Sequence, residues 1–148
     1  MNPEQKLKEL GIELDDVQVG DRPLIPWVQT GNLLYCSGKT PANAPKGQVG
    51  KQLSTEEGYQ AARDCAIGQL AVAKAALGDL NRVKRVVKVL GMVNAVPEFG
   101  EQPQVINGFS DLMVEVFGEN GRHARSAVGM GSLPGNHPVE VEVIFEVE

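Results

Sequence analysis

The feature that most constrains the fold is a long helical pattern near the middle of the chain. Ser54 and Glu57 have the spacing of a capping box, which marks the start of a helix. Apolar residues recur at helical spacing from there to Leu77, and Gly78 is the residue type that most often ends a helix. Much of the apolar face is alanine, which allows close packing. The pattern therefore predicts a helix that lies on a sheet.

Extended segments on both sides of this helix can form that sheet. Residues 27–30 and 33–37 flank a Gly–Asn pair, which is typical of a β-hairpin. After the helix, the valine-rich segment 82–93 and the short segment 126–130 are also predicted strands. In residues 139–147 apolar residues alternate with glutamates, and a period of two indicates a strand with one buried face.

Two further helices and one long loop complete the predicted order. Residues 2–10 suit a short amphipathic helix that ends at Gly11, and residues 104–117 suit a second long helix. Residues 40–52 are rich in glycine, proline and asparagine and are predicted to be a loop. We expect one α+β domain over residues 1–148, with residues 1–21 as an N-terminal helical extension. Both long helices should cover one face of a mixed sheet, and copies of the chain are the expected cover of the other face.

Charge and composition argue against several classes of protein. The net charge of −5 disfavours nucleic-acid binding, which depends on Lys and Arg neutralising phosphates. The main basic cluster falls in the predicted strand 82–93, where it is interpreted as the charged edge of a sheet (Arg82, Lys84, Arg85 and Lys88). No stretch approaches the roughly 18 apolar residues of a membrane span, so we expect a cytoplasmic protein. Cys36 and Cys65 are expected to be free thiols, and no metal site is expected.

Three residues are candidates for a chemical site. Arg125 heads a predicted strand and is followed by small residues that leave space beside its guanidinium, a planar fork that matches a carboxylate. Spacing alone is more typical of a surface or salt-bridged arginine. Glu140 could orient a water molecule as a general base, although alternation also places it with Glu142 on a solvated face. Ser37, just before Gly38, is the third candidate.

Other reactive residues fit weaker hypotheses. His123 could transfer protons near neutral pH, but a lone histidine in a polar turn is more often exposed and idle. Cys36 has no base nearby in the sequence, which disfavours a cysteine nucleophile. The glycine-rich residues 129–135 do not match the spacing or helix context of a phosphate-binding loop.

At this point the sequence resembles the RidA/YjgF family of imine deaminases, also known as endoribonuclease L-PSP-like proteins. The C-terminal part, from Ala124-Arg125-Ser126 to Val139-Glu140-Val141, is similar to the family signature of an arginine followed by an apolar-Glu-apolar strand. Pro26-Trp27-Val28-Gln29 and Ser37-Gly38 resemble the first hairpin of the family. Asn107, placed at the start of the second long helix, is similar as well. The resemblance covers residues 22–148.

The resemblance implies a chorismate-mutase-like fold of the bacillus type, a homotrimer with clefts between subunits, and no metal or organic cofactor. Arg125 would hold the carboxylate of a 2-imino or 2-enamino acid, and Glu140 would position the hydrolytic water. The products would be a 2-oxo acid and ammonia. The remaining residues expected to line the substrate site are Ser37, Gly38, Trp27, Asn107 and Ala127.

Three positions differ from the usual family pattern. Ala127 replaces a cysteine, Trp27 replaces a tyrosine, and His123 replaces a proline. The extra N-terminal helix indicates a longer subgroup. These differences keep a second hypothesis open, in which the cleft binds small 2-oxo acids without turning them over, as a sensor or chaperone would. Ribonuclease activity is a third hypothesis, which the acidic net charge disfavours.

Overall fold

The predicted extended segments form one five-stranded sheet in the computed structural model, which describes residues 1–148. The strand order is β1-β2-β5-β3-β4. All neighbouring pairs are antiparallel except β3 and β4, which are parallel, so the sheet is mixed as predicted. The strands are β1 (Trp27–Thr30), β2 (Leu33–Lys39), β3 (Val83–Asn94), β4 (Ala124–Met130) and β5 (Val139–Val147).

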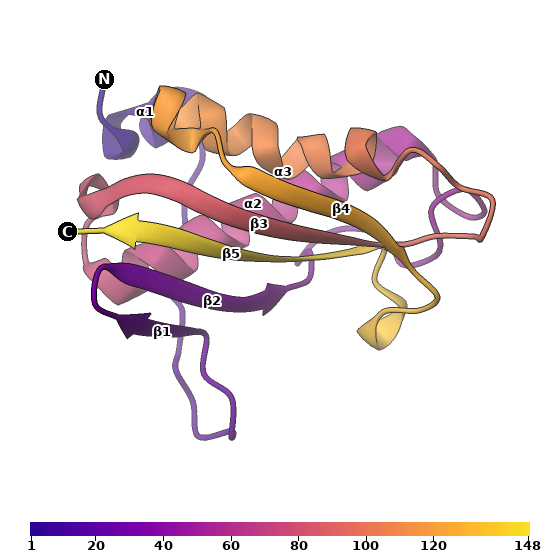
Figure 1. Ribbon diagram of the computed structural model, residues 1–148, viewed down its shortest axis with the longest axis horizontal. Coiled ribbons are helices and arrows are strands. Elements are labelled where there is room, and N and C mark those ends of the chain that lie inside the picture. Colours follow the sequence, from indigo (N-terminus) through magenta and orange to yellow (C-terminus); the bar gives the residue numbers. More distant parts are fainter.

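Both long helices lie on the same face of this sheet (Figure 1). Helix α2 (Thr55–Leu77) begins at the predicted capping box, in which the Ser54 side chain accepts a hydrogen bond from the Glu57 N–H. Helix α3 (Gln102–Phe117) packs against α2 at Gly108, where a Cβ atom would collide with the backbone carbonyl of Tyr59. A glycine is therefore required for the two helices to approach so closely.

The core lies between the helices and the sheet. Along β5 every second residue is buried, so one face of the strand contributes to the core and the other does not. The same alternation in β3 buries Val89 and Val93 completely. The residues of β5 that point into the core are Val139, Val141, Val143, Phe145 and Val147.

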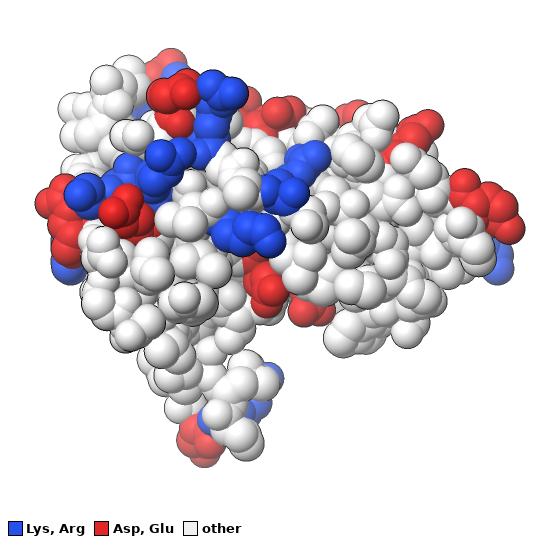
Figure 2. Space-filling model, viewed as in Figure 1, with Lys and Arg blue, Asp and Glu red and all other residues white.

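No element of the chain covers the opposite face of the sheet. Figure 2, viewed as in Figure 1, shows this face as largely uncharged, with Lys and Arg gathered toward one side. Val28 and Tyr35 are 52% and 43% exposed there, and Leu90 and Ile144 are half-buried. We call this surface the open face. Apolar side chains collected on one exposed surface are typical of an interaction site.

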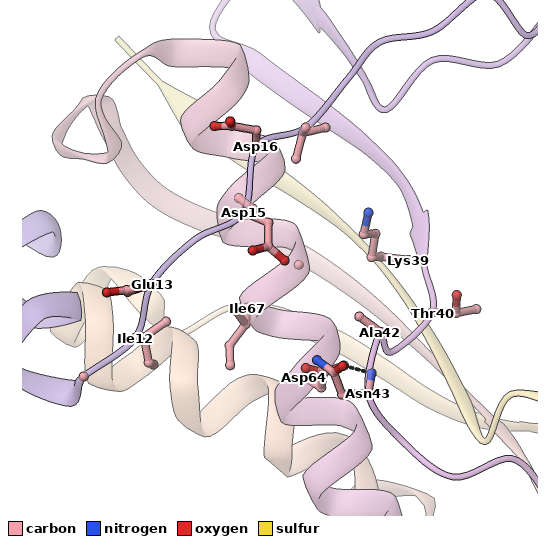
Figure 3. A pocket seen from close by; sticks show the side chains of 14 residues that line it. Ile12, Glu13, Asp15, Asp16, Lys39, Thr40, Ala42, Asn43, Asp64 and Ile67 are labelled. Atoms are coloured by element: carbon pink, nitrogen blue, oxygen red, sulfur yellow. Dashed lines mark hydrogen bonds between the residues drawn. The ribbon is translucent and has the colours of Figure 1, made fainter.

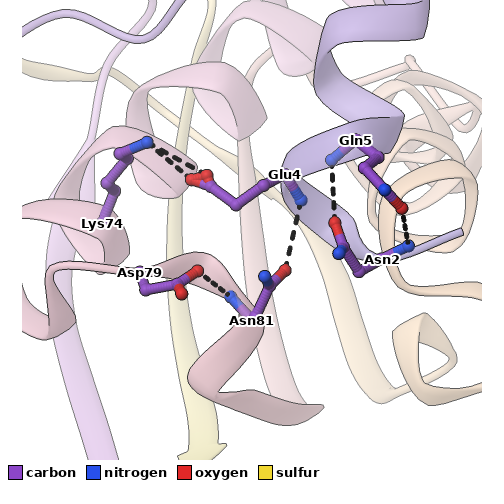
Figure 4. A network of polar contacts seen from close by, with 6 residues as sticks. All are labelled: Asn2, Glu4, Gln5, Lys74, Asp79 and Asn81. Atoms are coloured by element: carbon purple, nitrogen blue, oxygen red, sulfur yellow. Dashed lines mark hydrogen bonds and ion pairs between the residues drawn. The ribbon is translucent and has the colours of Figure 1, made fainter.

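The N-terminal helix α1 (Pro3–Leu10) is attached to the rest of the chain by polar contacts at one end (Figure 4). Its Asn2 forms a capping box, and Glu4 pairs with Lys74 of α2 at 2.5 Å. Leu7 is buried in the core. The connection from α1 to β1 then extends beyond the β1 edge of the sheet (Figure 1).

Two local predictions were wrong, and both errors have a physical cause. The second long helix begins at Gln102, so Asn107 lies in its second turn and not at its start. Strand β3 is not an edge strand along its whole length, because β4 pairs with it from Lys88 onward; only Lys84 and Arg85, which precede this pairing, stay on an open edge. The edge position of β3 is otherwise taken by β4, which returns in parallel after α3. A crossover of that kind leaves no mark in the local residue pattern.

Membrane and thiol features are simple. None of the helices has the length and apolar character that a membrane crossing requires. Cys36 and Cys65 are both buried and free. Burial raises the pKa of the Cys36 thiol to about 12, which keeps it protonated and opposes a role as a nucleophile.

Candidate functional site

Arg125 lies on the edge strand β4 and turns its side chain toward α3. Its partner in β3 is Val89, a core residue, which identifies the face to which Arg125 belongs. The Nη1 atom of Arg125 donates to Asn107 Oδ1 at 2.8 Å and to Ser110 Oγ at 3.1 Å. Asn107 and Ser110 are one helical turn apart, so both can face the same guanidinium. The structure thus brings Arg125 and Asn107 together.

The charge of Arg125 has no direct counterion within the chain. Its hydrogen-bond acceptors are an amide oxygen and a hydroxyl, and none of the four ion pairs of the structure includes it. Burial lowers the pKa of the Arg125 guanidinium, and the charge of Asp111 partly opposes this effect. Burial without neutralisation makes a cation favourable for an incoming anion. Because Nη1 makes both bonds, the edge formed by Nε and Nη2 stays free.

A small cavity of about 220 Å³ opens beside this guanidinium. His123 contributes to its wall and is held by two contacts, at 2.6 Å from its Nδ1 to the Gly121 carbonyl oxygen and at 2.9 Å from its Nε2 to Ser110 Oγ. The cavity has room for a small anion but not for a large ligand. Its lining residues are Ser110, Val114, Arg122, His123 and Arg125.

Glu140 lies against Gly38 on the open face. It sits between Val139 and Val141 in β5, whose side chains are buried under the helices, so alternation turns Glu140 the other way. A Cβ atom at Gly38 would collide with the Glu140 carboxylate and lie 3.1 Å from its Cδ. Only glycine therefore leaves room for this carboxylate. The regular pairing of β2 with β5 is interrupted here, between Cys36 and Lys39.

Ser37 joins β2 to the segment that precedes β1. Its hydroxyl donates to the Ile25 carbonyl oxygen at 2.7 Å, and its N–H donates to the Pro26 carbonyl oxygen at 2.9 Å. Trp27, the residue after Pro26, pairs with Cys36 across β1 and β2. The hydroxyl hydrogen of Ser37 is thus engaged within the chain, while its oxygen can still accept.

Most of the expected site residues fall into two separate groups. The Arg125 group consists of Arg125, Asn107 and Ala127, which lie on β4 and α3 on the helix side of the sheet. The Glu140 group consists of Glu140, Gly38 and Ser37, which lie on β5 and β2. Trp27 pairs with the core residue Cys36 and packs against the core, so it belongs to neither group.

One chain cannot bring these two groups into contact. Arg125 is aligned across β3 with Val143 of β5, and Glu140 is three residues farther along that strand. Two strand spacings and three residue rises separate their Cα atoms by about 14 Å. Arg125 and Glu140 also extend from opposite faces of the sheet. A shared cleft would therefore need a second copy of the chain.

Ser110 was missed by the sequence analysis, and His123 was considered idle. The signal for Ser110 was its spacing from Asn107, because residues three apart share a helix face. His123 lies two residues before Arg125 on the chain, but its contact with Ser110 depends on how α3 packs against β4.

The largest cavity lies elsewhere, between α2, residues 11–17 and residues 39–43 (Figure 3). It measures about 580 Å³, and its lining includes four carboxylates and one cation, Lys39. Asp64 there accepts a hydrogen bond from the backbone N–H of Asn43 at 3.0 Å. Such a lining repels a carboxylate ligand, so this cavity does not compete with Arg125 as an anion site. Its carboxylates are Glu13, Asp15, Asp16 and Asp64.

Comparison with known proteins gives consistent matches over nearly the whole chain. Residues 4–147 match a family model described as "YjgF/chorismate_mutase-like, putative endoribonuclease". Protein TCP17 of Trypanosoma cruzi is 45% identical, over 95% of this chain and 91% of its own length.

Solved structures agree with this match. Protein Atu1372 of Agrobacterium tumefaciens, of unknown function, is 46% identical with a TM-score of 0.90, covering 99% of this chain and 94% of its own. A "putative endoribonuclease" of Shewanella oneidensis is 32% identical with a TM-score of 0.93, covering 99% of this chain and all of its own.

Proposed function

Since this chain belongs to the YjgF/RidA family, with its chorismate-mutase-like fold, we propose that it hydrolyses reactive 2-imino and 2-enamino acids to 2-oxo acids and ammonia. The reaction takes place in clefts between copies of the chain, in a homotrimer. Arg125 anchors the substrate carboxylate, and Glu140 of a neighbouring copy orients the water.

The observation that carries this proposal is the state of Arg125. Its half-buried guanidinium is held through Nη1 by two neutral oxygens and has no ion-pair partner. The free Nε–Nη2 edge offers two parallel N–H groups, which is the geometry that binds a carboxylate at two points. A surface arginine would instead be fully hydrated or paired with an acidic residue. A small carboxylate is the ligand that this arrangement favours.

The chemistry needs little more than a positioned water. The imine carbon of the substrate is attacked by water, the C–O bond forms, and the carbon–nitrogen bond then breaks to release ammonia and leave a 2-oxo acid. Glu140 accepts a proton from the water and returns it to the departing nitrogen. The bare backbone at Gly38 gives the Glu140 carboxylate the space to meet that water.

The separation of the Arg125 group and the Glu140 group supports assembly of several copies. The open face exposes apolar side chains of β1, β2 and β4, including Val28, Tyr35 and Val128, which burial against another copy would cover. A contact in which the Arg125 edge of one copy meets the Glu140 group of the next is head-to-tail, and such contacts form a closed ring when the rotation between copies returns to the first one. The family resemblance indicates a ring of three.

Ammonia release from imines that an amino-acid oxidase generates in situ tests this function. Wild type should accelerate release, and Arg125→Ala should lower kcat/KM by about 100-fold, as loss of a charge-assisted pair predicts. Arg63→Ala is the matched control, because it removes a positive charge from the surface pair with Glu115. Equal rates for wild type and Arg125→Ala would refute the mechanism.

A second function, binding without turnover, has one observation in its favour. The Ser37 hydroxyl already donates to Ile25, and Ala127 stands where the family usually has a cysteine, so the pocket has fewer free donors than expected. In that case 2-oxobutyrate would bind in an Arg125-dependent manner while ammonia release stayed at the uncatalysed rate. Measuring both quantities on one preparation separates the two functions.

A further inference from the structure

A chain of hydrogen bonds runs behind Arg125, through Ser110 to His123. The His123 Nδ1 lies 2.6 Å from the carbonyl oxygen of Gly121, and a carbonyl can only accept, so Nδ1 carries a hydrogen. In a neutral imidazole the other nitrogen, Nε2, is then an acceptor. Ser110 Oγ lies 2.9 Å from Nε2 and must donate its hydrogen to it. The lone pairs of the Ser110 oxygen are thereby left for Arg125 Nη1, at 3.1 Å.

The surroundings of His123 keep this arrangement in one state. Burial lowers the pKa of His123 most; the hydrogen bond to the Gly121 carbonyl opposes this in part, and the positive charge of Arg125 adds a smaller lowering. Arg122, from the turn before β4, also lines the cavity, and Asp111 of α3 acts electrostatically on Arg125. A neutral imidazole near pH 7 fixes the direction of the Ser110 hydroxyl.

The contacts of Nη1 decide where the rest of the guanidinium points. Nη1 has two hydrogens, one for Asn107 and one for Ser110. With both in use, the planar group cannot turn about its last bonds without losing a contact. We infer that Ser110 and His123 are positioning residues, which hold the Nε–Nη2 edge of Arg125 toward the carboxylate of a 2-oxo or 2-imino acid. This inference rests on the proposed function of Arg125.

The positioning of Arg125 by Ser110 and His123 should affect substrate binding more than the chemical step. A substrate carboxylate keeps its charge and place throughout the reaction, so an interaction with it contributes equally before and in the transition state. Loss of the Ser110 or His123 contact should therefore raise KM and leave kcat nearly unchanged. A substitution at Glu140 should do the reverse.

The test combines binding, kinetics and histidine spectroscopy. Calorimetry with 2-oxobutyrate should show binding about 2- to 10-fold weaker for Ser110→Ala and His123→Leu, the loss expected for one hydrogen bond. Ser110→Thr retains the hydroxyl and should bind within about 2-fold of wild type, the matched rescue. Ammonia release should show the loss in KM. Nitrogen NMR of the wild type should show His123 protonated at Nδ1 and accepting at Nε2.

Each outcome bears on one proposal or the other. If the wild type neither binds 2-oxobutyrate nor releases ammonia, the proposed function fails. If Arg125→Ala abolishes binding while Ser110→Ala and His123→Leu bind like wild type, the function stands and the positioning role is wrong. An Nε2–H tautomer in the wild type would also overturn that role, and this result needs no variant to fold. Failure of Ser110→Thr to restore affinity would show that the Ser110 hydroxyl does not position Arg125.

Discussion

The Arg125 group and the Glu140 group differ in how completely one chain builds them. Arg125 is held by Asn107 and Ser110, which α3 supplies from the same chain. The Glu140 carboxylate, by contrast, has no hydrogen-bond partner in its own chain and lies over the glycine backbone at Gly38. One group is a cation that its own chain supports on one side, and the other is a carboxylate without such support.

This difference supports the proposal that two copies of the chain each supply one of the two groups of a cleft. The anchor for the substrate carboxylate needs rigid support, and a helix packed on the sheet gives it. The group that handles water needs room, which the open face gives. Neither group has an ionic partner in its own chain, and contact between two copies would place the unpaired cation near the unpaired anion.

The largest effect is expected from breaking the contact between copies. Leu90 is half-buried on the open face, and Leu90→Glu would bury a charge in the proposed interface, which costs several kcal/mol. We expect monomers by analytical ultracentrifugation and a loss of ammonia release of at least about 100-fold. Ala75→Glu, at an exposed position of α2, adds the same charge and should change neither property. An active Leu90→Glu monomer would contradict the proposal that the cleft needs two copies of the chain.

A smaller effect is expected from filling the space beside Glu140. The methyl group of Gly38→Ala would meet the Glu140 carboxylate and displace it. Since loss of general-base catalysis costs about 100-fold, kcat should fall by that order while 2-oxobutyrate still binds and the assembly is kept. Gly100→Ala, where a Cβ meets nothing within 4 Å, is the control. Loss of binding with unchanged kcat would contradict the assignment of Glu140 to chemistry.

The smallest effect concerns stability on the Arg125 side. The pKa of His123 is lowered in the folded protein, so below the ordinary value of 6.5 the unfolded chain binds more protons than the folded one. Protonation then favours unfolding, and the wild type should lose stability as the pH falls from 7 to 5. In urea unfolding, the free energy of unfolding of His123→Gln should fall less than that of the wild type between these pH values. The difference between the two proteins should be under about 1 kcal/mol. An equal pH dependence in both would show that His123 is not shielded.

Much of the fold was readable from local pattern. The capping box at Ser54, the stop at Gly78 and the alternation in residues 139–147 each depend on neighbours within a few positions, and all three were confirmed. The place of β3 inside the sheet was not readable, because it depends on where the chain returns after α3.

The site was less predictable than the fold. Arg125 and Glu140 were candidates from their positions in the sequence, but spacing alone favoured structural roles for both, and the resemblance was needed to favour a functional one. That they extend from opposite faces depends on the register of three strands, which no single segment records. Ser110 and His123 are 13 residues apart and meet only through the packing of α3 on β4.

The central claim is that Arg125 of one copy works with Glu140 of another, and mixing inactive chains tests it most directly. Arg125→Ala and Glu140→Gln chains, each with strongly reduced ammonia release on its own at substrate concentrations below KM, would be unfolded together and refolded as mixed rings. Random mixing restores one intact cleft in four, so about a quarter of the wild-type rate of ammonia release should return. If both residues act within one chain, no activity would return at any mixing ratio, and the account would be wrong.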